Sequence, residues 1–214
     1  MKDRFALITG AFFLFMASFS SKERVSNVRT SFGSLFGGGD TSDGVNVDGL
    51  STQGKVEQFS KAKYPDGHTD YDIDIMARTI WGEARNEGYK GMQAVANVIM
   101  NRFELAQKNS AYARRFGKTV AQICRKPFQF SVWNEKDPNR AKLEKVTIID
   151  HRFETAQEIA RKAIEGRLSD VTSSADHYLN IEFTKEIRGG SLPNWADLTK
   201  TTRKIGAHTF LRLV

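Results

Sequence analysis

The sequence changes character near residue 70, and this change sets how much of the chain can form a packed core. Seven of the 17 glycines fall between Gly33 and Gly54, among Ser, Asp, Asn and Thr. A tract of this composition buries too little apolar surface to offset its ordering entropy. After Asp70, apolar residues recur at three- and four-residue intervals, which is typical of amphipathic helices. We therefore predict a flexible linker over residues 25–68 and a single folded domain over residues 69–214.

The linker is preceded by an apolar run, Phe5–Phe19, which follows the charged start Met1–Arg4. Its 15 residues suit the apolar region of a secretory signal and fall short of the roughly 20 needed to span a bilayer as a helix. Ser18 and Ser20 supply small residues for a cleavage site. We predict that residues 1–24 are a signal peptide or an uncleaved anchor, with a buried core helix as the alternative. The protein is then exported to the periplasm or cell envelope, and an anchor would tether it to the inner membrane.

Composition narrows the class of protein. Charged residues make up 27% of the chain and hydrophobic residues 40%, as in soluble globular proteins. The net charge of +7 favours a polyanionic partner: nucleic acid, a membrane surface or a wall polymer. One basic stretch includes Lys108, Arg114, Arg115, Lys118, Arg125 and Lys126. Because charge runs usually face solvent and the N-terminus predicts export, we expect no nucleic acid partner. No feature of the sequence indicates an oligomeric state.

Two helices are predicted at the start of the domain. The first begins at Asp70, and Gly82 and Gly88 are expected to interrupt it. Its apolar stripe consists of Ile73, Met76, Ala77, Ile80 and Trp81. The second helix, Gly91–Phe103, has an apolar stripe of its own. Both helices would belong to the single core of a mostly helical domain.

The remaining elements are shorter. Thr119 and Gln122 resemble a capping box for a short helix that Pro127 ends. Another amphipathic helix covers Phe153–Ile164 and stops at Gly166. An alternating pattern later in the chain predicts a short strand or extended segment, with one face formed by Ile205, Ala207, Thr209 and Leu211. The predicted fold class is mainly α (α+β), with a small extended part.

Glu83 is the residue best placed for chemistry. It follows Met76 by seven residues, which puts it at the edge of the buried stripe of the first helix. A carboxyl held against apolar neighbours resists ionisation, so its pKa rises and it can donate a proton near neutral pH. A general acid for a glycosidic bond needs that property. The alternative is an ordinary helix-end glutamate paired with Arg78 or Arg85.

Other chemistries have weaker support. His151, His177 and His208 are scattered without the spacing of a zinc peptidase, and no nucleophile-elbow GxSxG occurs. The single cysteine, Cys124, excludes an intrachain disulfide and a cysteine-rich zinc site. We predict no metal site and no cofactor.

Five short blocks follow one another through the domain. They are Met76–Arg85 (MARTIWGEAR), Gly91–Arg102 (GMQAVANVIMNR), Pro127–Ser131 (PFQFS), Ala175–Tyr178 (ADHY), and Pro193–Trp195 (PNW) with Ile205–Phe210 (IGAHTF). In this order, over residues 72–212, they resemble the SleB-type cell wall hydrolases, the spore-cortex-lytic family. The resemblance implies a lysozyme-like, mainly α catalytic domain.

The resemblance also implies an activity: cleavage of peptidoglycan glycan strands between N-acetylmuramic acid and N-acetylglucosamine by a lytic transglycosylase. Glu83 matches the catalytic glutamate of the family. It would protonate the leaving oxygen and then accept the proton of the muramic acid C6 hydroxyl, which closes a 1,6-anhydro ring. The implied substrate contacts are Gln129, Ser131, His177 and Tyr178. Such an enzyme would serve envelope remodelling or phage-type lysis.

Two alternatives remain open. One is lysozyme-like hydrolysis by a muramidase, which would require a second carboxylate as nucleophile or base. Glu87 is the nearest acidic residue to Glu83 in sequence. The other is a module that binds peptidoglycan without cleaving it.

Overall fold

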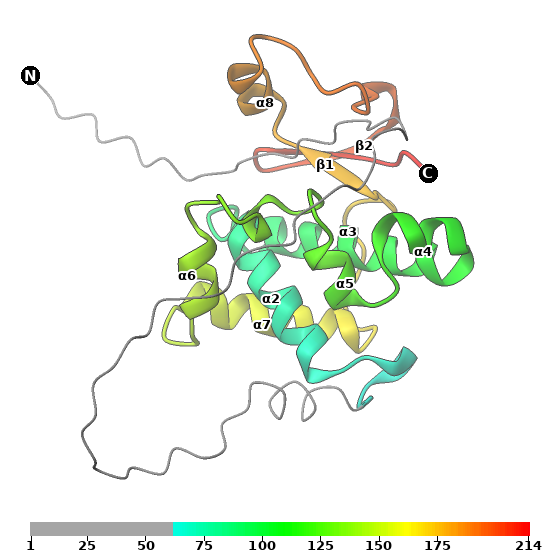
Figure 1. Cartoon of the computed structure of the whole chain (residues 1–214), viewed down its shortest axis with the longest axis vertical. Helices are drawn as coiled ribbons and strands as arrows, with labels where there is room; N and C mark the ends of the chain where they lie inside the picture. The colour runs from blue at the N-terminus through cyan, green and yellow to red at the C-terminus, as the bar shows by residue number, and fades with distance from the viewer. Residues whose placement is uncertain (1–61) are drawn as a thin grey trace, which may run out of the picture.

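The computed structural model describes residues 62–214 (Figure 1). The predicted signal or anchor, residues 1–24, and the linker up to residue 61 lie outside this part. Its helices are α2 (Asp70–Ala84), α3 (Gly88–Lys108), α4 (Ser110–Phe116), α5 (Val120–Arg125), α6 (Arg140–Lys145), α7 (His151–Ile164) and α8 (Ile181–Ile187). Its strands are β1 (His177–Leu179), β2 (Thr201–Ile205) and β3 (His208–Leu211). The prediction of a mainly α (α+β) domain with a small extended part is confirmed.

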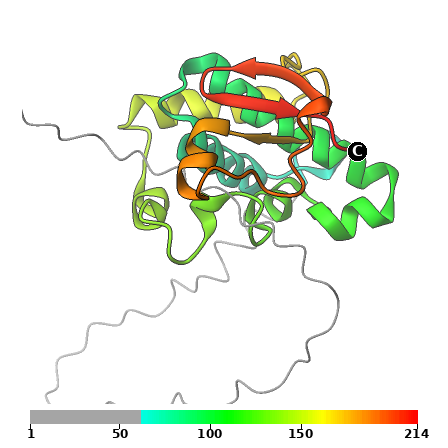
Figure 2. The ribbon, with the colours of Figure 1, turned by 90° about the horizontal axis from the view of Figure 1, so that it is seen from above.

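The helices α2–α7 form one layer, and the small sheet, together with α8, lies on one side of it (Figures 1 and 2). The sheet is antiparallel, with the strand order β1-β3-β2. Tyr178 of β1 pairs with Phe210 of β3, and Ile205 of β2 pairs with His208. The central strand β3 therefore joins two segments that are separated by more than twenty residues of sequence.

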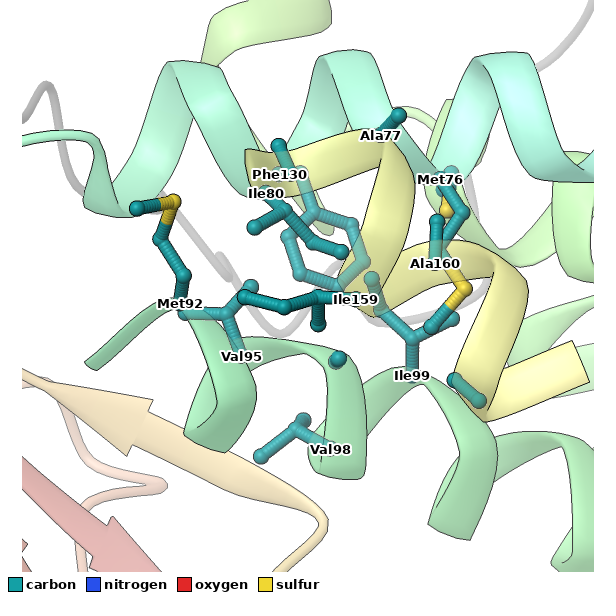
Figure 3. Close-up of a cluster of buried hydrophobic side chains, with 14 of the residues drawn as sticks. Met76, Ala77, Ile80, Met92, Val95, Val98, Ile99, Phe130, Ile159 and Ala160 are labelled. Atoms are coloured by element: carbon teal, nitrogen blue, oxygen red, sulfur yellow. The ribbon is translucent and has the colours of Figure 1, made fainter. Parts of the chain in front are cut away.

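The core lies where α2, α3 and α7 meet. Figure 3 shows side chains from these helices turned toward one another, together with Phe130 from the loop after α5. Met76, Ile80, Ile99 and Ile159 have no solvent-exposed surface. The whole predicted stripe of the first helix is buried, which is why its apolar residues recur at helical spacing.

The start of α2 is fixed by a capping box that also ties α2 to α5. Thr69 Oγ1 accepts a hydrogen bond from the Asp72 backbone N–H at 3.2 Å, and Asp72 Oδ2 accepts one from the Thr69 N–H at 3.0 Å. The other carboxylate oxygen, Oδ1, accepts from the Ala121 N–H at 2.8 Å. The predicted cap of α5 is also present, since Thr119 Oγ1 accepts from the Gln122 N–H.

The predicted interruption of the first helix at Gly82 is wrong. α2 continues through Gly82 to Ala84. A Cβ at residue 82 would lie 2.4 Å from Cγ2 of Val132, so glycine is required there for close approach of another segment. Gly88 does mark a break, because it begins α3 with a φ of +69°.

The predicted single strand at Ile205–Leu211 is also wrong. The chain turns at Gly206, which has a φ of +56°, and forms a β2–β3 hairpin. All four residues of β3 are buried, so the apparent alternation does not describe two faces. The second predicted helix is longer than expected, because α3 extends five residues beyond Phe103.

Packing against the domain begins a few residues before α2. His68 is 2% exposed, and its ring lies 4.6 Å from that of Phe103. Tyr64 donates a hydrogen bond to Asp70 at 2.6 Å. The predicted linker therefore ends in residues that touch the domain. Within residues 62–214, no helix has the length and apolar character needed to cross a bilayer.

Candidate active site

Glu83 lies in the last turn of α2, partly buried, with polar groups of two other segments directed at its carboxyl. Oε1 accepts hydrogen bonds from the backbone N–H of Val132 at 3.3 Å and from Ser131 Oγ at 3.4 Å. Oε2 accepts from the Tyr178 hydroxyl at 3.0 Å. The structure thus brings together three of the predicted site residues: Glu83, Ser131 and Tyr178.

Burial raises the pKa of Glu83 to about 7. The hydrogen bonds from Val132, Tyr178 and Ser131 favour the ionised form and lower the pKa, and the negative charge of Asp137 raises it. The loss of hydration is the dominant effect. Near neutral pH this carboxyl is therefore a mixture of acid and carboxylate, as a group that both donates and accepts a proton should be.

The loop after α5 reaches Glu83 because α2 leaves room for it. Gly82 has no side chain, so Val132 can sit directly against the helix and present its N–H to Oε1. Trp133 then fixes the loop to α2, since its Nε1 donates to Thr79 Oγ1 at 2.8 Å. Just before this turn, Phe128 has a φ of +64° and is 56% exposed. A bulky residue in that conformation is an outlier, and such strain is concentrated at functional sites.

Tyr178 reaches Glu83 from the sheet. Its ring packs between aromatic neighbours, 5.0 Å from His208 and 5.6 Å from Phe210. Burial and the neighbouring Glu83 carboxyl raise the pKa of the phenol well above 10. The hydroxyl therefore keeps its proton and acts as a hydrogen-bond donor to the carboxylate.

The structure does not bring His177 to Glu83. Adjacent residues of a strand point to opposite faces, so His177 points away from the side on which Tyr178 meets Glu83. Its Nδ1 is bonded to Asp176 Oδ1, and Nε2 lies 3.4 Å from the Arg115 guanidinium. Arginine can only donate, so Nε2 is the acceptor and the ring is neutral. Burial lowers the pKa of His177 to about 4, in agreement with that state.

Asp176 and Arg102 complete a buried polar cluster around His177. Asp176 also accepts hydrogen bonds from the N–H groups of Leu213 and Val214, at 3.0 and 2.9 Å. Although burial raises the pKa of Asp176, the bonds from His177, Leu213 and Val214 lower it below the ordinary value. Arg102 donates to the Asp176 carbonyl oxygen at 2.6 Å and is 2% exposed. This cluster joins α3 to the sheet.

Asp137 is a second acidic residue of the site that the sequence analysis missed. It is 7% exposed, and Oδ1 accepts from the Asn139 N–H at 2.8 Å. Its other oxygen, Oδ2, is buried and makes no hydrogen bond with residues 62–214. Asn139 in turn accepts from Arg85, two residues after Glu83, at 3.1 Å. Asp137 lies in the segment NEKDPNR, which looks like a solvent-exposed turn, so no sequence signal indicated its burial.

The other predicted residues have different surroundings. The Gln129 side chain is in the same loop as Ser131 and is 5% exposed, covered by the protein itself. Glu87, the acidic residue nearest to Glu83 in sequence, is directed to the β2–β3 hairpin, where Oε2 accepts from the Ala207 N–H at 3.0 Å. No cluster of three His, Cys, Asp or Glu side chains suited to a metal ion occurs among the residues that the structure describes.

Comparison with known proteins identifies relatives of this domain. The model of the cell wall hydrolase family matches residues 86–211. The spore cortex-lytic enzyme of Bacillus cereus is 27% identical over 177 residues, which cover 81% of this chain and 57% of that enzyme. The enzyme of the same name from Oceanobacillus iheyensis is 29% identical over 191 residues, which cover 83% of this chain and 56% of that enzyme. The chain thus spans little more than half the length of these curated relatives.

Two solved structures are also similar. The catalytic domain of the Bacillus cereus SleB protein is 28% identical, with a TM-score of 0.47, and the match covers 70% of this chain and 95% of that one. The catalytic domain of the germination-specific lytic transglycosylase SleB from Bacillus anthracis is also 28% identical, with a TM-score of 0.46 and coverage of 69% and 99%.

Proposed function

The chain belongs to the cell wall hydrolase family, and on that premise we propose that it cleaves the glycan strands of peptidoglycan. The bond cut is the one between N-acetylmuramic acid and N-acetylglucosamine. One observation carries the proposal: a partly buried carboxyl, that of Glu83, has a pKa of about 7 and three hydrogen-bond donors around it. Such a group can protonate a leaving oxygen at neutral pH.

The contacts of Glu83 indicate which of its oxygens carries the proton. A backbone N–H can only donate, so Oε1, which Val132 contacts, acts as an acceptor in both protonation states. The transferable proton then belongs on Oε2. Tyr178 can accept a hydrogen bond from this proton before the transfer and donate to the carboxylate afterwards. The tyrosine thereby favours the charged state that forms during the reaction.

We propose a transglycosylase reaction with one catalytic acid. Glu83 donates its proton to the glycosidic oxygen, and N-acetylglucosamine leaves with a free 4-hydroxyl. The C6 hydroxyl of the muramic acid then attacks C1, and the Glu83 carboxylate accepts the hydroxyl proton. The product is a 1,6-anhydro ring, the acid is restored and no water is consumed. The attack is intramolecular, so orientation of the sugar supplies much of the rate.

The residues around Glu83 would hold the sugar. Ser131 and Tyr178 already meet at the carboxyl, and their hydroxyl groups, with the Gln129 amide, are suited to sugar hydroxyl and acetamido groups. The resemblance implies a substrate contact for His177, but this residue is 1% exposed and points away from Glu83 on β1. We propose that it acts through the placement of β1.

One observation favours the alternative of hydrolysis. The buried Asp137 is a second carboxylate whose charge acts on Glu83, and its Oδ2 makes no hydrogen bond with the described residues. A lysozyme-like muramidase needs a second carboxylate of this kind, as nucleophile or as the base that activates water. Asp137 replaces Glu87 in that hypothesis, because Glu87 is bonded to the hairpin.

Mass spectrometry of digested peptidoglycan separates the two reactions and tests the function itself. We expect muropeptides that end in 1,6-anhydro-muramic acid, one water lighter than the hydrolysed end and resistant to borohydride. Reducible muramic acid ends would establish hydrolysis. A folded wild-type protein that releases no muropeptides would contradict the enzymatic function and favour a binding module.

We propose that the protein acts in the periplasm or cell envelope. The support is the apolar run Phe5–Phe19 at the start of the sequence and the location of the proposed substrate outside the cytoplasm. Cleavage after residue 20 or so would release the domain on its linker, whereas an uncleaved segment would tether it to the inner membrane. N-terminal sequencing of the mature protein distinguishes these outcomes.

A further inference from the structure

A basic groove is lined by residues from the start of α2, from α4 and from α5, and Glu83 is not among them. The groove has a volume of about 960 Å³. Four cationic side chains line it: Arg114 from α4, Lys118 from the following loop, and Arg125 and Lys126 at the end of α5. Folding thus gathers four residues of the basic stretch around one hollow, where the sequence alone suggested only a solvent-exposed face.

Negative charge in the described part of the chain only partly offsets the four cations of this groove. Its one acidic lining residue is Asp72, whose two oxygens are taken by the capping box and by the Ala121 N–H. None of the salt bridges between described residues includes any of the four cations. Their contacts are with neutral groups; for example, Arg125 donates to the Tyr71 hydroxyl at 2.6 Å. The groove therefore suits an anion.

Residues 126–131 connect the groove with the candidate active site. Lys126 and Pro127 line the groove, and Ser131 contacts Glu83. Five residues of extended chain reach at most about 17 Å, so one polymer can contact both places. The exposed, strained Phe128 lies on this path. Arg125 also links the groove to the loop that contacts Glu83, because its guanidinium lies 5.4 Å from the ring of Trp133 in that loop.

We propose that the basic groove binds the free carboxylates of the peptide stems of the strand whose glycan is cut at Glu83; this rests on the proposed function. Each stem is attached to the muramic acid and carries carboxylates at its terminus and along its length. A strand placed at Glu83 therefore presents negative charges at a distance from the scissile bond. Arginine guanidinium groups pair with carboxylates through two parallel hydrogen bonds, which gives this groove a carboxylate preference.

The test measures binding of Glu83→Gln protein, which leaves the polymer intact, to insoluble walls freed of phosphate polymers. The walls are used with their stem carboxylates free or capped as neutral methyl amides. The groove variant adds four substitutions: Arg114→Gln, Lys118→Gln, Arg125→Gln and Lys126→Gln. The matched control removes the same charge from exposed lysines elsewhere through Lys142→Gln, Lys145→Gln, Lys185→Gln and Lys204→Gln.

We expect the groove variant to bind free-carboxylate walls at least about tenfold more weakly than the control, because charge-assisted hydrogen bonds are lost. On capped walls the two should bind equally. The double variant Arg114→Gln/Lys118→Gln, whose side chains are exposed, should show a smaller loss of the same kind if the fourfold variant is unstable. Circular dichroism checks the fold of each variant.

Three results would overturn the proposal. Equal binding of variant and control to free-carboxylate walls would show that the groove does not contact the substrate. An equal loss on capped walls would assign the groove to glycan or to general charge attraction. A loss seen only before the phosphate polymers are removed would identify a phosphate ligand. Failure of the proposed function is distinct, because the chain with Glu83 intact would then release no muropeptides.

Discussion

Glu83 and Asp176 are two acids beside the same strand, β1, and the protein shifts their pKa values in opposite directions. Asp176 is fully buried, yet its pKa is lowered, because two backbone N–H groups and His177 donate to it. Glu83 receives only one backbone N–H, at 3.3 Å, and two hydroxyl groups that can rotate. Its pKa rises to about 7. The difference indicates that the number of fixed donors, rather than burial alone, separates a structural carboxylate from a reactive one.

The substitution Glu83→Gln should have the largest effect on activity. It should not lower the stability of the folded protein. Removal of the transferable proton should lower the cleavage rate by about 10²–10⁴. Folding raises the pKa of Glu83 from 4.5 to about 7. The folded wild-type protein therefore loses stability progressively as the pH rises between those values. Glutamine does not ionise, and the variant should gain at most about 3 kcal/mol over the wild type above pH 7.

Denaturant unfolding at pH 5 and pH 8, with the cleavage assay, measures both effects. The stability difference between variant and wild type should grow with pH. A variant that is much less stable than the wild type at pH 8 would show that Glu83 supports the fold as Asp176 does.

The substitution Asp176→Asn should have the reverse profile. An amide cannot accept all three hydrogen bonds from His177, Leu213 and Val214, so one buried donor loses its partner. We expect a loss of about 1–3 kcal/mol in the free energy of unfolding. Activity per folded molecule should change little. If instead stability is unchanged and cleavage is lost, Asp176 takes part in the reaction and the comparison fails.

The substitution Asp137→Asn should move the pH dependence of cleavage. In the proposed reaction Glu83 acts as the acid, so kcat/KM should fall as the pH rises past about 7 and the carboxyl ionises. Removal of the Asp137 charge lowers the pKa of Glu83 and should shift this fall to lower pH. The matched control is Glu135→Gln, an exposed residue of the same loop, which should leave the profile in place. Loss of all activity without such a shift would favour Asp137 as the second carboxylate of a hydrolase.

The smallest effect on the pH dependence of cleavage is expected for the substitution His177→Gln. The imidazole, with a pKa of about 4, is neutral wherever Glu83 changes charge, so it contributes nothing to the fall of activity near pH 7. The variant can lose stability, since His177 bonds to Asp176, but the pH at which activity falls should not move. A displaced profile would show that His177 belongs with Glu83 rather than with Asp176.

The parts of the fold that follow helical periodicity could be predicted from sequence. The stripe of α2 is buried as expected, and Glu83 lies at its edge because the spacing from Met76 fixes its direction. Gly82 was misinterpreted, since glycine disfavours helices by propensity but here permits close approach of Val132. That requirement depends on a partner fifty residues away, which no local pattern contains.

The site residues outside the helices were harder to predict from sequence patterns. Ser131 and Tyr178 follow from the family resemblance, and the structure brings both to Glu83. His177 was expected from the same resemblance, but adjacent residues of a strand point to opposite faces, so it does not accompany Tyr178 to Glu83. Asp137 carries no local signal, and the contact that links its loop to α2, between Asn139 and Arg85, joins residues more than fifty positions apart.

The pairing of β1 with β3 has a consequence for biosynthesis. Tyr178 is held by a strand whose partner, His208–Leu211, is synthesised about thirty residues later. The neighbouring helices α2 and α3 can pack early, whereas α7 is synthesised more than sixty residues after α2. β1 has no strand beside it until the later segment has emerged. Glu83 therefore gains its Tyr178 contact only at a late stage of folding. The candidate active site therefore stays incomplete until β3 has been made.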